Sequence, residues 1–467
     1  MSTPEVAVSG AGIGGLSLAL SLAQSGVQSV LFERQPDWSE VGAGVQLGPN
    51  ATRRLQTWGL GKALEGCASW PDRVEVFDGV HGKLLATLPL GEQCRHRYGA
   101  PYATLMRADL QTLLQERVAQ LGLTDIHLGE KVLHASVTSR IGALAGDPSV
   151  TPSLGDISFD VQSSSIGVDL ESEGAHELSG SDPSLTRHNA QVLVGADGVF
   201  SRLRETHFKK LSLKYTGHLA YRAMIRWSDL PPAMRSSSVQ LFLAPRLHWV
   251  QYPVKAGEWL NVVVLLEVSP REREHVGESE GEGEGHKKRF LNNPWGQQAS
   301  QVSQASASGD QNSNVNSNSS QDLQALMQAV ELAHGQLKDL ASLVQTWTLW
   351  PLFACTPMSS SEGMARGRLA LLGDAAHPML PYLAQGAGMS IEDAQVFSLC
   401  WAQSNTSVSE RLKRYAEMRW QRCAQVQNRA LRNARVFHYG QPLGLMRDLA
   451  IRALGARLLD MPWLYSY

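Results

Sequence analysis

The chain has 467 residues, of which 43% are hydrophobic and 18% are charged, and its formal net charge at pH 7 is −2. This length exceeds one ordinary core and predicts two or three domains, while the near-neutral charge argues against nucleic acid as a partner. The five cysteines are scattered without a C-x-x-C pair, no basic and apolar leader begins the chain, and no run of about 18 apolar residues occurs, so we expect a cytoplasmic protein without a spanning helix, a disulfide framework or a bound metal.

The N-terminal segment predicts a strand, a turn, a helix and a second strand. Residues 6–8 are apolar, residues 16–24 have helical spacing, and residues 30–32 form another apolar run that ends at Glu33. This order is typical of the βαβ unit that opens a dinucleotide-binding fold.

The turn in this unit carries the pattern G-x-G-x-x-G at Gly10, Gly12 and Gly15. The first glycine permits a tight turn, the second lets the backbone approach a pyrophosphate, and the third allows close contact between helix and strand. Glu33 stands where an acid accepts hydrogen bonds from ribose hydroxyls. The alternatives are a glycine turn without a ligand and a surface acid.

Two segments in the middle of the chain are diluted in apolar residues. Residues 142–188 are rich in Ser, Gly and Asp, with one strand candidate at 157–161. Residues 269–321 combine a charge run with a Ser/Asn/Gln tract, so we expect a disordered insertion near 270–320. It separates a predicted strand at 259–268 from a predicted helix at 323–334.

Two further motifs follow. Residues 192–204 (VLVGADGVFSRLR) place Asp197 and Gly198 after a strand and before a basic helix start. Residues 371–394 place Asp374 after another strand and then open a helix with a glycine-rich turn at 386–388. The N-terminus of that helix could hold a polarised carbonyl or an anion. Residues 389–459 are predicted to be mostly helical.

These three motifs, in this order, resemble those of the single-component (class A) flavoprotein monooxygenases, the aromatic hydroxylases related to p-hydroxybenzoate hydroxylase. GAGVQLGPNA at 42–51, YGAPYATLMRADL at 98–110 and the 373–394 run are most similar to the salicylate, 3-hydroxybenzoate and 6-hydroxynicotinate hydroxylases. The resemblance implies an α/β fold in which a Rossmann-like FAD-binding domain with a parallel sheet is interleaved with a smaller mixed β-sheet substrate domain. We assign residues 1–70, 98–200 and 345–397 to the first domain, 71–97 and 201–344 to the second, and 398–467 to a helical C-terminal region.

The resemblance also implies FAD as cofactor and NADH or NADPH as co-substrate. The pyrophosphate would lie on the glycine turn, the adenosine ribose on Glu33, and the ribityl–pyrophosphate region on Asp374. The residues implied in cofactor binding are Gly10, Gly12, Ile13, Gly15, Glu33, Arg34, Val45, Arg107, Asp197, Asp374, Gly386, Ala387, Gly388 and Met389. Asp197 would serve cofactor and nicotinamide together.

The implied reaction is hydroxylation of a small hydroxylated aromatic acid by O2 through a flavin C4a-hydroperoxide. Such a reaction needs a side chain that helps to deprotonate the substrate phenol. His218 and Tyr221 are the candidates, although their odd spacing on a strand places them on opposite faces of a sheet, and a structural role is an equal alternative for each. For His377 we favour a role in orienting the loop over a role as a base.

Alternatives remain at the level of the whole protein. One is a ring hydroxylase of ubiquinone biosynthesis, and another is a flavin-binding oxidase or regulator that does not hydroxylate. Residues 411–457 hold eleven Lys or Arg against two acids. We expect this stretch to pack against the FAD-binding domain or a second copy in a homodimer, with peripheral membrane contact as the alternative.

Overall fold

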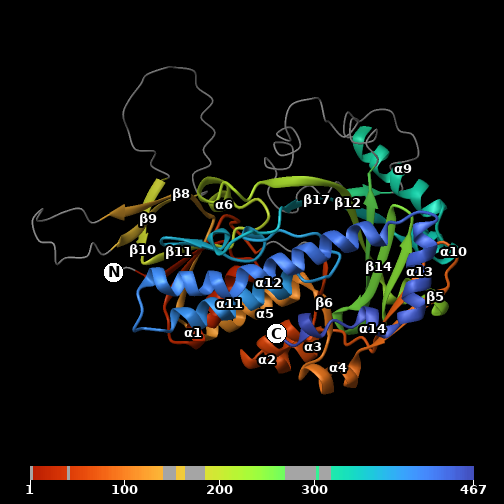
Figure 1. Ribbon diagram of the computed structural model, residues 1–467, viewed down its shortest axis with the longest axis horizontal. Helices are drawn as coiled ribbons and strands as arrows, with labels where there is room; N and C mark the ends of the chain where they lie inside the picture. The colour runs from red at the N-terminus through yellow and green to blue at the C-terminus, as the bar shows by residue number, and fades with distance from the viewer. Residues whose placement is uncertain (1–3, 39–42, 140–153, 164–184, 269–300, 304–316) are drawn as a thin grey trace, which may run out of the picture.

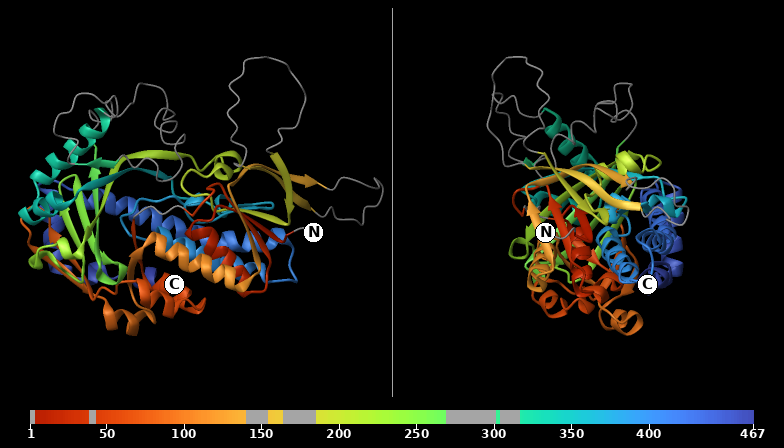
Figure 2. Two further views of the ribbon diagram at one scale, coloured as in Figure 1. Left: turned by 180° about the vertical axis from the view of Figure 1, so that it is seen from behind. Right: turned by 90° about the vertical axis from the view of Figure 1, so that its left-hand side faces the viewer.

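The computed structural model describes residues 4–38, 43–139, 154–163, 185–268, 301–303 and 317–467. Two β-sheets lie toward opposite ends of the long axis, and one long helix, α12 (Val408–Phe437), runs between them (Figures 1 and 2). Nearly all of the predicted insertion at 270–320 falls outside the described residues.

A six-stranded sheet forms one end of the molecule, in the order β18-β19-β11-β1-β2-β7. Every pairing in it is parallel except that of β18 with β19. The short apolar runs predicted at the N-terminus, at 192–194 and at 369–372 all become strands of this sheet, because strands covered on both faces need continuous apolar residues. The strands are β1 (Val6–Ser9), β2 (Ser29–Glu33), β7 (Thr124–Leu128), β11 (Val192–Gly195), β18 (Ala365–Arg366) and β19 (Leu369–Leu371).

Helices pack on one face of this sheet and a small antiparallel sheet covers the other. The helices are α1 (Ile13–Gln24), α5 (Arg107–Leu121) and α11 (Gly386–Trp401), with α12 packed on α11 (Figure 1). The small sheet consists of β8 (Glu130–Ser139), β9 (Leu154–Ser163) and β10 (Leu185–Ala190). Phe32 on β2 contacts Phe159 and His188 of this small sheet, with ring centroids 5.6 and 5.0 Å apart.

An eight-stranded mixed sheet forms the other end, in the order β16-β17-β12-β15-β14-β13-β4-β5. Helices α9 (Ser317–Glu331) and α10 (Gly335–Leu343) cover one face of it, and the second hydrophobic core lies between them and the sheet. The strands are β4 (Arg73–Asp78), β5 (Leu84–Pro89), β12 (Leu213–Arg226), β13 (Val239–Ala244), β14 (Leu247–Val254), β15 (Trp259–Glu267), β16 (Gln301–Ser303) and β17 (Thr346–Cys355).

The position of β17 corrects one predicted boundary. We assigned residues from 345 onward to the FAD-binding domain, but β17 pairs with β12 and belongs to the eight-stranded sheet. After β11, the next strand that belongs to the parallel sheet is β18.

Shorter elements join the two sheets. β3 (Gly44–Leu47) pairs with β6 (Ala103–Met106), and helices α2 (Pro49–Thr57), α3 (Gly61–Cys67) and α4 (Gly91–Tyr98) surround this pair. The remaining helices are α6 (Arg202–His207), α13 (Leu443–Leu454), α14 (Ala456–Leu459) and α15 (Pro462–Tyr465).

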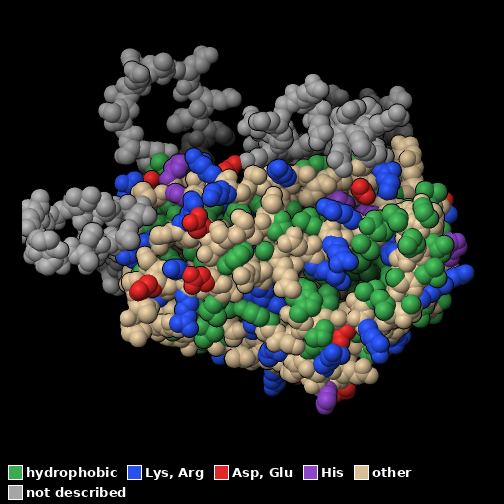
Figure 3. Space-filling view, in the orientation of Figure 1, with side chains coloured by type: hydrophobic (Ala, Val, Ile, Leu, Met, Phe, Trp, Pro, Cys, Tyr) green, Lys and Arg blue, Asp and Glu red, His purple; other side chains and the backbone are tan. Residues whose placement is uncertain are grey.

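The C-terminal helix α13 packs on the eight-stranded sheet. Its Ile451 lies in a small apolar cluster with Val76, Leu85 and Leu243. Within the basic stretch 411–457, α12 packs on α11 at the parallel-sheet end, as expected, whereas α13 packs on the other sheet. The opposite side of α13 leaves Leu445 and Met446 54% and 64% exposed, and apolar side chains are visible over this helix (Figure 3). None of the helices described is both long and apolar enough for a membrane span.

Candidate cofactor site

Three predicted motifs meet at the carboxyl edge of the parallel sheet. Ser9 pairs with Gly195, and Gly195 pairs with Leu371, so the loops that follow β1, β11 and β19 leave the sheet side by side. In open α/β sheets this edge is where ligands bind.

The glycine turn is built as its sequence predicts. Gly10 has a φ of +103°, and a Cβ there would stand 2.5 Å from the Ala196 carbonyl oxygen. A Cβ at Gly15 would stand 1.9 Å from the Gly10 oxygen, so both positions exclude any side chain. At Gly12 the nearest atom to such a Cβ is an Arg107 nitrogen at 3.7 Å. Gly12 is therefore the one of these three glycines at which a Cβ would make only an ordinary van der Waals contact.

Helix α1 begins at Ile13, directly after Gly12. Its N-cap, Gly12, provides no side-chain hydrogen bond, and the first helical bond goes from the Leu16 N–H to the Gly12 oxygen at 3.0 Å. The first-turn N–H groups thus point out of the helix end, where they carry partial positive charge. This end is suited to a pyrophosphate.

Glu33 ends strand β2 beside the turn. One carboxylate oxygen accepts from the Ala11 N–H at 2.7 Å and the other from the Gln35 N–H at 3.0 Å. These bonds fix the carboxylate against the glycine turn. Burial lowers the pKa of the adjacent Arg34, against the opposing charges of Glu33 and Asp197.

Arg107 comes to the site from a later segment of the chain than the glycine turn. It is the first residue of α5, directly after β6, whose partner strand β3 carries Val45 opposite Leu105. Burial lowers the pKa of Arg107, and the negative charges of Asp374 and Glu33 oppose that effect. Arg107 therefore lies between the two predicted ends of the cofactor site.

Asp374 follows β19 and faces the first turn of α11. Its carboxylate lies 3.9 Å from the position of a Cβ at Gly386, and burial raises its pKa. The α11 N-terminus, like that of α1, has no side-chain cap. Gly386, Ala387 and Gly388 form this turn, whereas the Met389 side chain is fully buried and its N–H donates to the Gln385 oxygen at 2.8 Å. Met389 thus faces the core and not the open end of the helix.

Asp197 has a local partner. Its carboxylate accepts from the Arg202 N–H at 2.9 Å, at the start of α6, and burial raises its pKa. Arg204, which the sequence did not indicate, connects this loop to the next one. Its guanidinium donates to the backbone oxygens of Asp374 and Ala375, at 3.1 and 3.0 Å, and to that of Val199.

A buried ion network supports the Asp374 loop from behind. Asp393 accepts from the Gly373 N–H at 2.9 Å, from His377 at 2.6 Å and from Arg419 on α12 at 2.6 Å. Burial opposes the charge on Asp393, but His377 and Arg419 outweigh it and lower its pKa to about 2. The ring of His377 is fully buried in this network, where a role in orienting the loop would place it, and that role stays a prediction.

A second buried carboxylate extends the network. Glu392 accepts from Arg419 at 2.8 Å, from both ends of the Arg422 fork at 2.6 Å, and from Asn50 of α2 at 2.7 Å. Two helices that carry opposite charges on their facing sides thus hold the loop in place. No local pattern predicts this pairing, because charged helix positions usually face solvent.

The two predicted catalytic residues face opposite sides of the eight-stranded sheet, as their spacing implied. Tyr221 is 1% exposed and lies in the core under α9 and α10, with its ring against Trp347. The structure contradicts a substrate contact for Tyr221. His218 faces the other side, where its ring lies 5.8 Å from that of Tyr382 and 5.5 Å from that of His438.

Arg222, on the same face as His218, was missed by the sequence analysis. Its guanidinium lies 5.6 Å from the Trp350 ring, and its charge is coupled to Arg107 and to Tyr252. Burial lowers its pKa, and its Nε has no acceptor among the residues described. A half-buried arginine with a remaining donor, on the sheet face that carries His218, is suited to an anionic ligand.

This fold and this edge of the sheet define a dinucleotide-binding flavoprotein. The chain matches the FAD binding domain family over residues 3–225 and 251–430, and it belongs to that family. It is 28% identical over 464 residues to a 3-hydroxybenzoate 6-hydroxylase of Polaromonas naphthalenivorans, which covers 99% of this chain and 96% of that protein. It is 27% identical to a 6-hydroxynicotinate 3-monooxygenase of Bordetella bronchiseptica, over 91% of this chain and 90% of that protein.

Solved structures agree with the fold. A salicylate hydroxylase substrate complex superposes with a TM-score of 0.68 at 21% identity, covering 100% of this chain and 96% of that one. A Klebsiella pneumoniae HpxO complex with FAD and uric acid superposes with a TM-score of 0.68 at 19% identity, covering 97% and 94%. The resemblance seen in the sequence is thereby confirmed, and the protein is an FAD-dependent aromatic monooxygenase.

The residues present fit FAD. The backbone at Gly12 carries no side chain that would block a pyrophosphate, and a Cβ there would lie 3.7 Å from Arg107. The uncapped N-termini of α1 and α11 offer N–H donors to a pyrophosphate, and the half-buried Arg107 offers a counter-charge.

Proposed function

We propose that this protein uses NADH or NADPH and O2 to hydroxylate a small hydroxylated aromatic acid. The observation that carries this proposal is Arg222, a half-buried cation whose guanidinium lies over the Trp350 ring on the sheet face that carries His218 and whose charge acts on the pKa of Arg107. The relatives named for hydroxybenzoate and hydroxynicotinate substrates support an acid of that class.

The proposed ring site lies on the face of the sheet away from α9 and α10. Trp350 and Tyr252 give it aromatic surface, and Arg222 gives it positive charge for a carboxylate or phenolate. Burial raises the pKa of Tyr252 to about 12, so its hydroxyl stays protonated and can donate a hydrogen bond. His218 stays a prediction as a proton acceptor for the phenol.

The cofactor residues have distinct proposed tasks. Gly12 and the first turn of α1 bind the pyrophosphate, Glu33 the ribose, and Asp374 with the 386–388 turn the flavin side. FAD, when bound, supplies the oxygen activation. The chain itself must position the aromatic acid, exclude water from the site and stabilise the phenolate. We expect the sheet face that carries Arg222 to provide these conditions.

The test is nicotinamide oxidation by the purified yellow protein with and without salicylate, 3-hydroxybenzoate, 4-hydroxybenzoate and 6-hydroxynicotinate, with hydrogen peroxide measured alongside. We expect at least one of these acids to stimulate oxidation with little peroxide. Arg222→Gln should raise the KM for that acid by about tenfold or more while it retains FAD. Absence of stimulation by every acid, from protein that holds its flavin, contradicts the proposal.

We further propose a cytoplasmic homodimer. All five cysteines are unpaired, which supports a reducing compartment. The exposed apolar side of α13, with Leu445, Met446 and Leu449, supports self-association over membrane contact, because its neighbour Asp448 is paired with Arg447 and reduces the basic charge there.

A further inference from the structure

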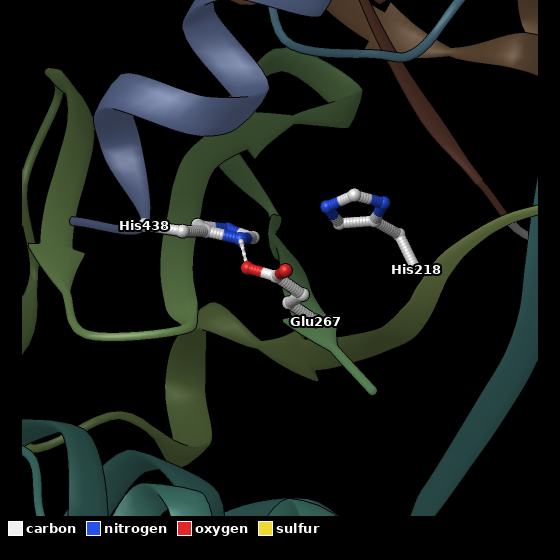
Figure 4. A group of neighbouring side chains, drawn as sticks. All are labelled: His218, Glu267 and His438. Carbon is white, nitrogen blue, oxygen red and sulfur yellow. Dashed lines mark ion pairs between the residues drawn. The ribbon is translucent and has the colours of Figure 1, made fainter. Parts of the chain in front are cut away.

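Two histidines and a glutamate meet where the eight-stranded sheet contacts the end of α12. His218 on β12 and Glu267 on β15 are direct partners in the strand register, and His438 follows α12. One ligand atom from each of the three side chains lies within 4.8 Å of the other two. Figure 4 shows the two imidazole rings on either side of the carboxylate.

The distance between His438 and Glu267 is that of an ion pair, longer than a hydrogen bond and close to the separation of two ligands around a metal. His438 Nδ1 lies 3.7 Å from Glu267 Oε2. Two ligands of a tetrahedral zinc ion, each about 2.1 Å from the metal, are about 3.4 Å apart. The other group of this kind, formed by His377, Asp393 and Cys423, differs because His377 Nε2 lies only 2.6 Å from Asp393 Oδ2.

Neighbouring groups orient both histidines for coordination. His218 Nδ1 lies 3.0 Å from the Thr216 oxygen, which places the proton on Nδ1 and the lone pair on Nε2. His438 Nε2 lies 3.0 Å from His248 Nδ1, and this ring-to-ring contact holds the His438 imidazole in place. Nδ1 of His438 then faces Glu267, and it is a buried atom that has no hydrogen-bond partner among the residues described. Such outer bonds are typical of metal-binding histidines.

A turn of the backbone fixes the spacing of two of the three residues. The Arg246 N–H donates to the His438 oxygen at 3.0 Å, and the Arg246 guanidinium donates to the Glu267 oxygen at 2.8 Å. Arg246 has a φ of 60°, in the left-handed region. The end of α12 is thus already tied to the edge of the sheet before any ion binds.

We propose that His218, Glu267 and His438 form a binding site for a divalent transition metal, with zinc as the preferred ion. Two imidazole nitrogens and a carboxylate oxygen suit zinc and leave a fourth position for water. While the ion is bound, Nε2 of His218 cannot accept a proton, so His218 would act as the proton acceptor for the phenol only in the metal-free protein. The ion would join strands β12 and β15 to the end of α12.

The test is zinc binding to tag-free, FAD-loaded protein that has been stripped with a chelator and dialysed. We expect saturable zinc binding by calorimetry, a higher melting temperature with zinc, and a Co²⁺ absorption spectrum of tetrahedral type. Glu267→Gln and His438→Gln should abolish this binding, and His248→Asn should weaken it by about tenfold or more. His81→Gln is the matched control, because His81 lies 2.6 Å from Asp78 in an exposed pair of the same kind elsewhere.

Equal zinc binding by wild type and the ligand variants, or none by wild type, overturns the proposal. If the variants do not fold, anomalous diffraction at the zinc edge on wild-type crystals decides. A peak among the three side chains supports the site, and its absence there overturns it. None of these measurements involves turnover, so their failure is distinct from failure of the proposed function.

Discussion

At the scale of single residues, the buried carboxylate of Asp393 holds the Asp374 loop in place. It is fully buried and accepts hydrogen bonds from Gly373, His377 and Arg419. Asp393→Asn leaves buried His377 without its counter-charge and Arg419 with Glu392 alone, so the free energy of unfolding should fall by about 3–5 kcal/mol. Urea unfolding of the FAD-free protein measures this. Glu417→Gln, which breaks an exposed pair with Lys413, is the control and should change the stability by less than about 0.5 kcal/mol.

His377 gives stability a defined dependence on pH. Burial opposes its charge, but Cys423 and Asp393 outweigh burial and raise its pKa well above its usual 6.5. A raised folded-state pKa contributes stability that is complete below the unfolded-state pKa of about 6.5 and that declines as pH rises from there through the folded-state pKa. Urea unfolding between about pH 6.5 and 8, below the usual range of thiol ionisation, should show decreasing stability. His377→Asn should remove this slope, and a wild-type stability that rises over this range would contradict the ion pair.

At the scale of elements, the glycine turn separates cofactor binding from folding. Gly12→Ala adds a Cβ that meets no protein atom closer than 3.7 Å, so the variant should fold but bind FAD at least about tenfold more weakly, because the methyl group enters the pyrophosphate space. Gly15→Ala places a Cβ 1.9 Å from the Gly10 oxygen and should disturb folding itself. Flavin absorbance and circular dichroism distinguish the two results. Gly66→Ala, which meets nothing within 4 Å, is the control. Full flavin content in Gly12→Ala would place the pyrophosphate elsewhere.

The elements that the sequence predicted share a local signal. Apolar runs and glycine spacing act over a few residues. They predict the strands at 6–8 and 369–372, the glycine turn, and the loops at the carboxyl edge of the parallel sheet. The sheet to which β17 belongs depends on pairing with β12, more than a hundred residues away, and no local pattern encodes it. For the same reason the alternation of His218 and Tyr221 was predicted, but the face covered by α9 and α10 was not.

Buried charges were the other gap between sequence and structure. Arg222 in a strand, and Glu392, Asp393 and Arg419 on helices, have the composition of solvated positions. Their burial results from the packing of α11 against α12 and of the eight-stranded sheet against the cofactor end, which only the assembled fold provides.

At the scale of the whole molecule, the exposed apolar side of α13 predicts self-association. Leu445 and Leu449 are each 54% exposed and lie one helical turn apart. Sedimentation equilibrium should give a dimer, and the double variant Leu445→Gln with Leu449→Gln should shift it to a monomer that keeps its FAD. A wild-type protein that stays monomeric across the concentration range, or a dimer that the double variant leaves unchanged, would contradict this surface.

The proposed hydroxylation transfers one oxygen atom of O2 to an aromatic acid. The measurement is turnover under ¹⁸O2 with the acid that stimulates nicotinamide oxidation, followed by mass spectrometry of the product. We expect the hydroxylated product to contain a single ¹⁸O atom from O2. In the reciprocal experiment, we expect no label from H2¹⁸O in the product. A product that takes its oxygen from water, or unchanged acid with all reducing equivalents recovered as hydrogen peroxide for every acid tried, would contradict it.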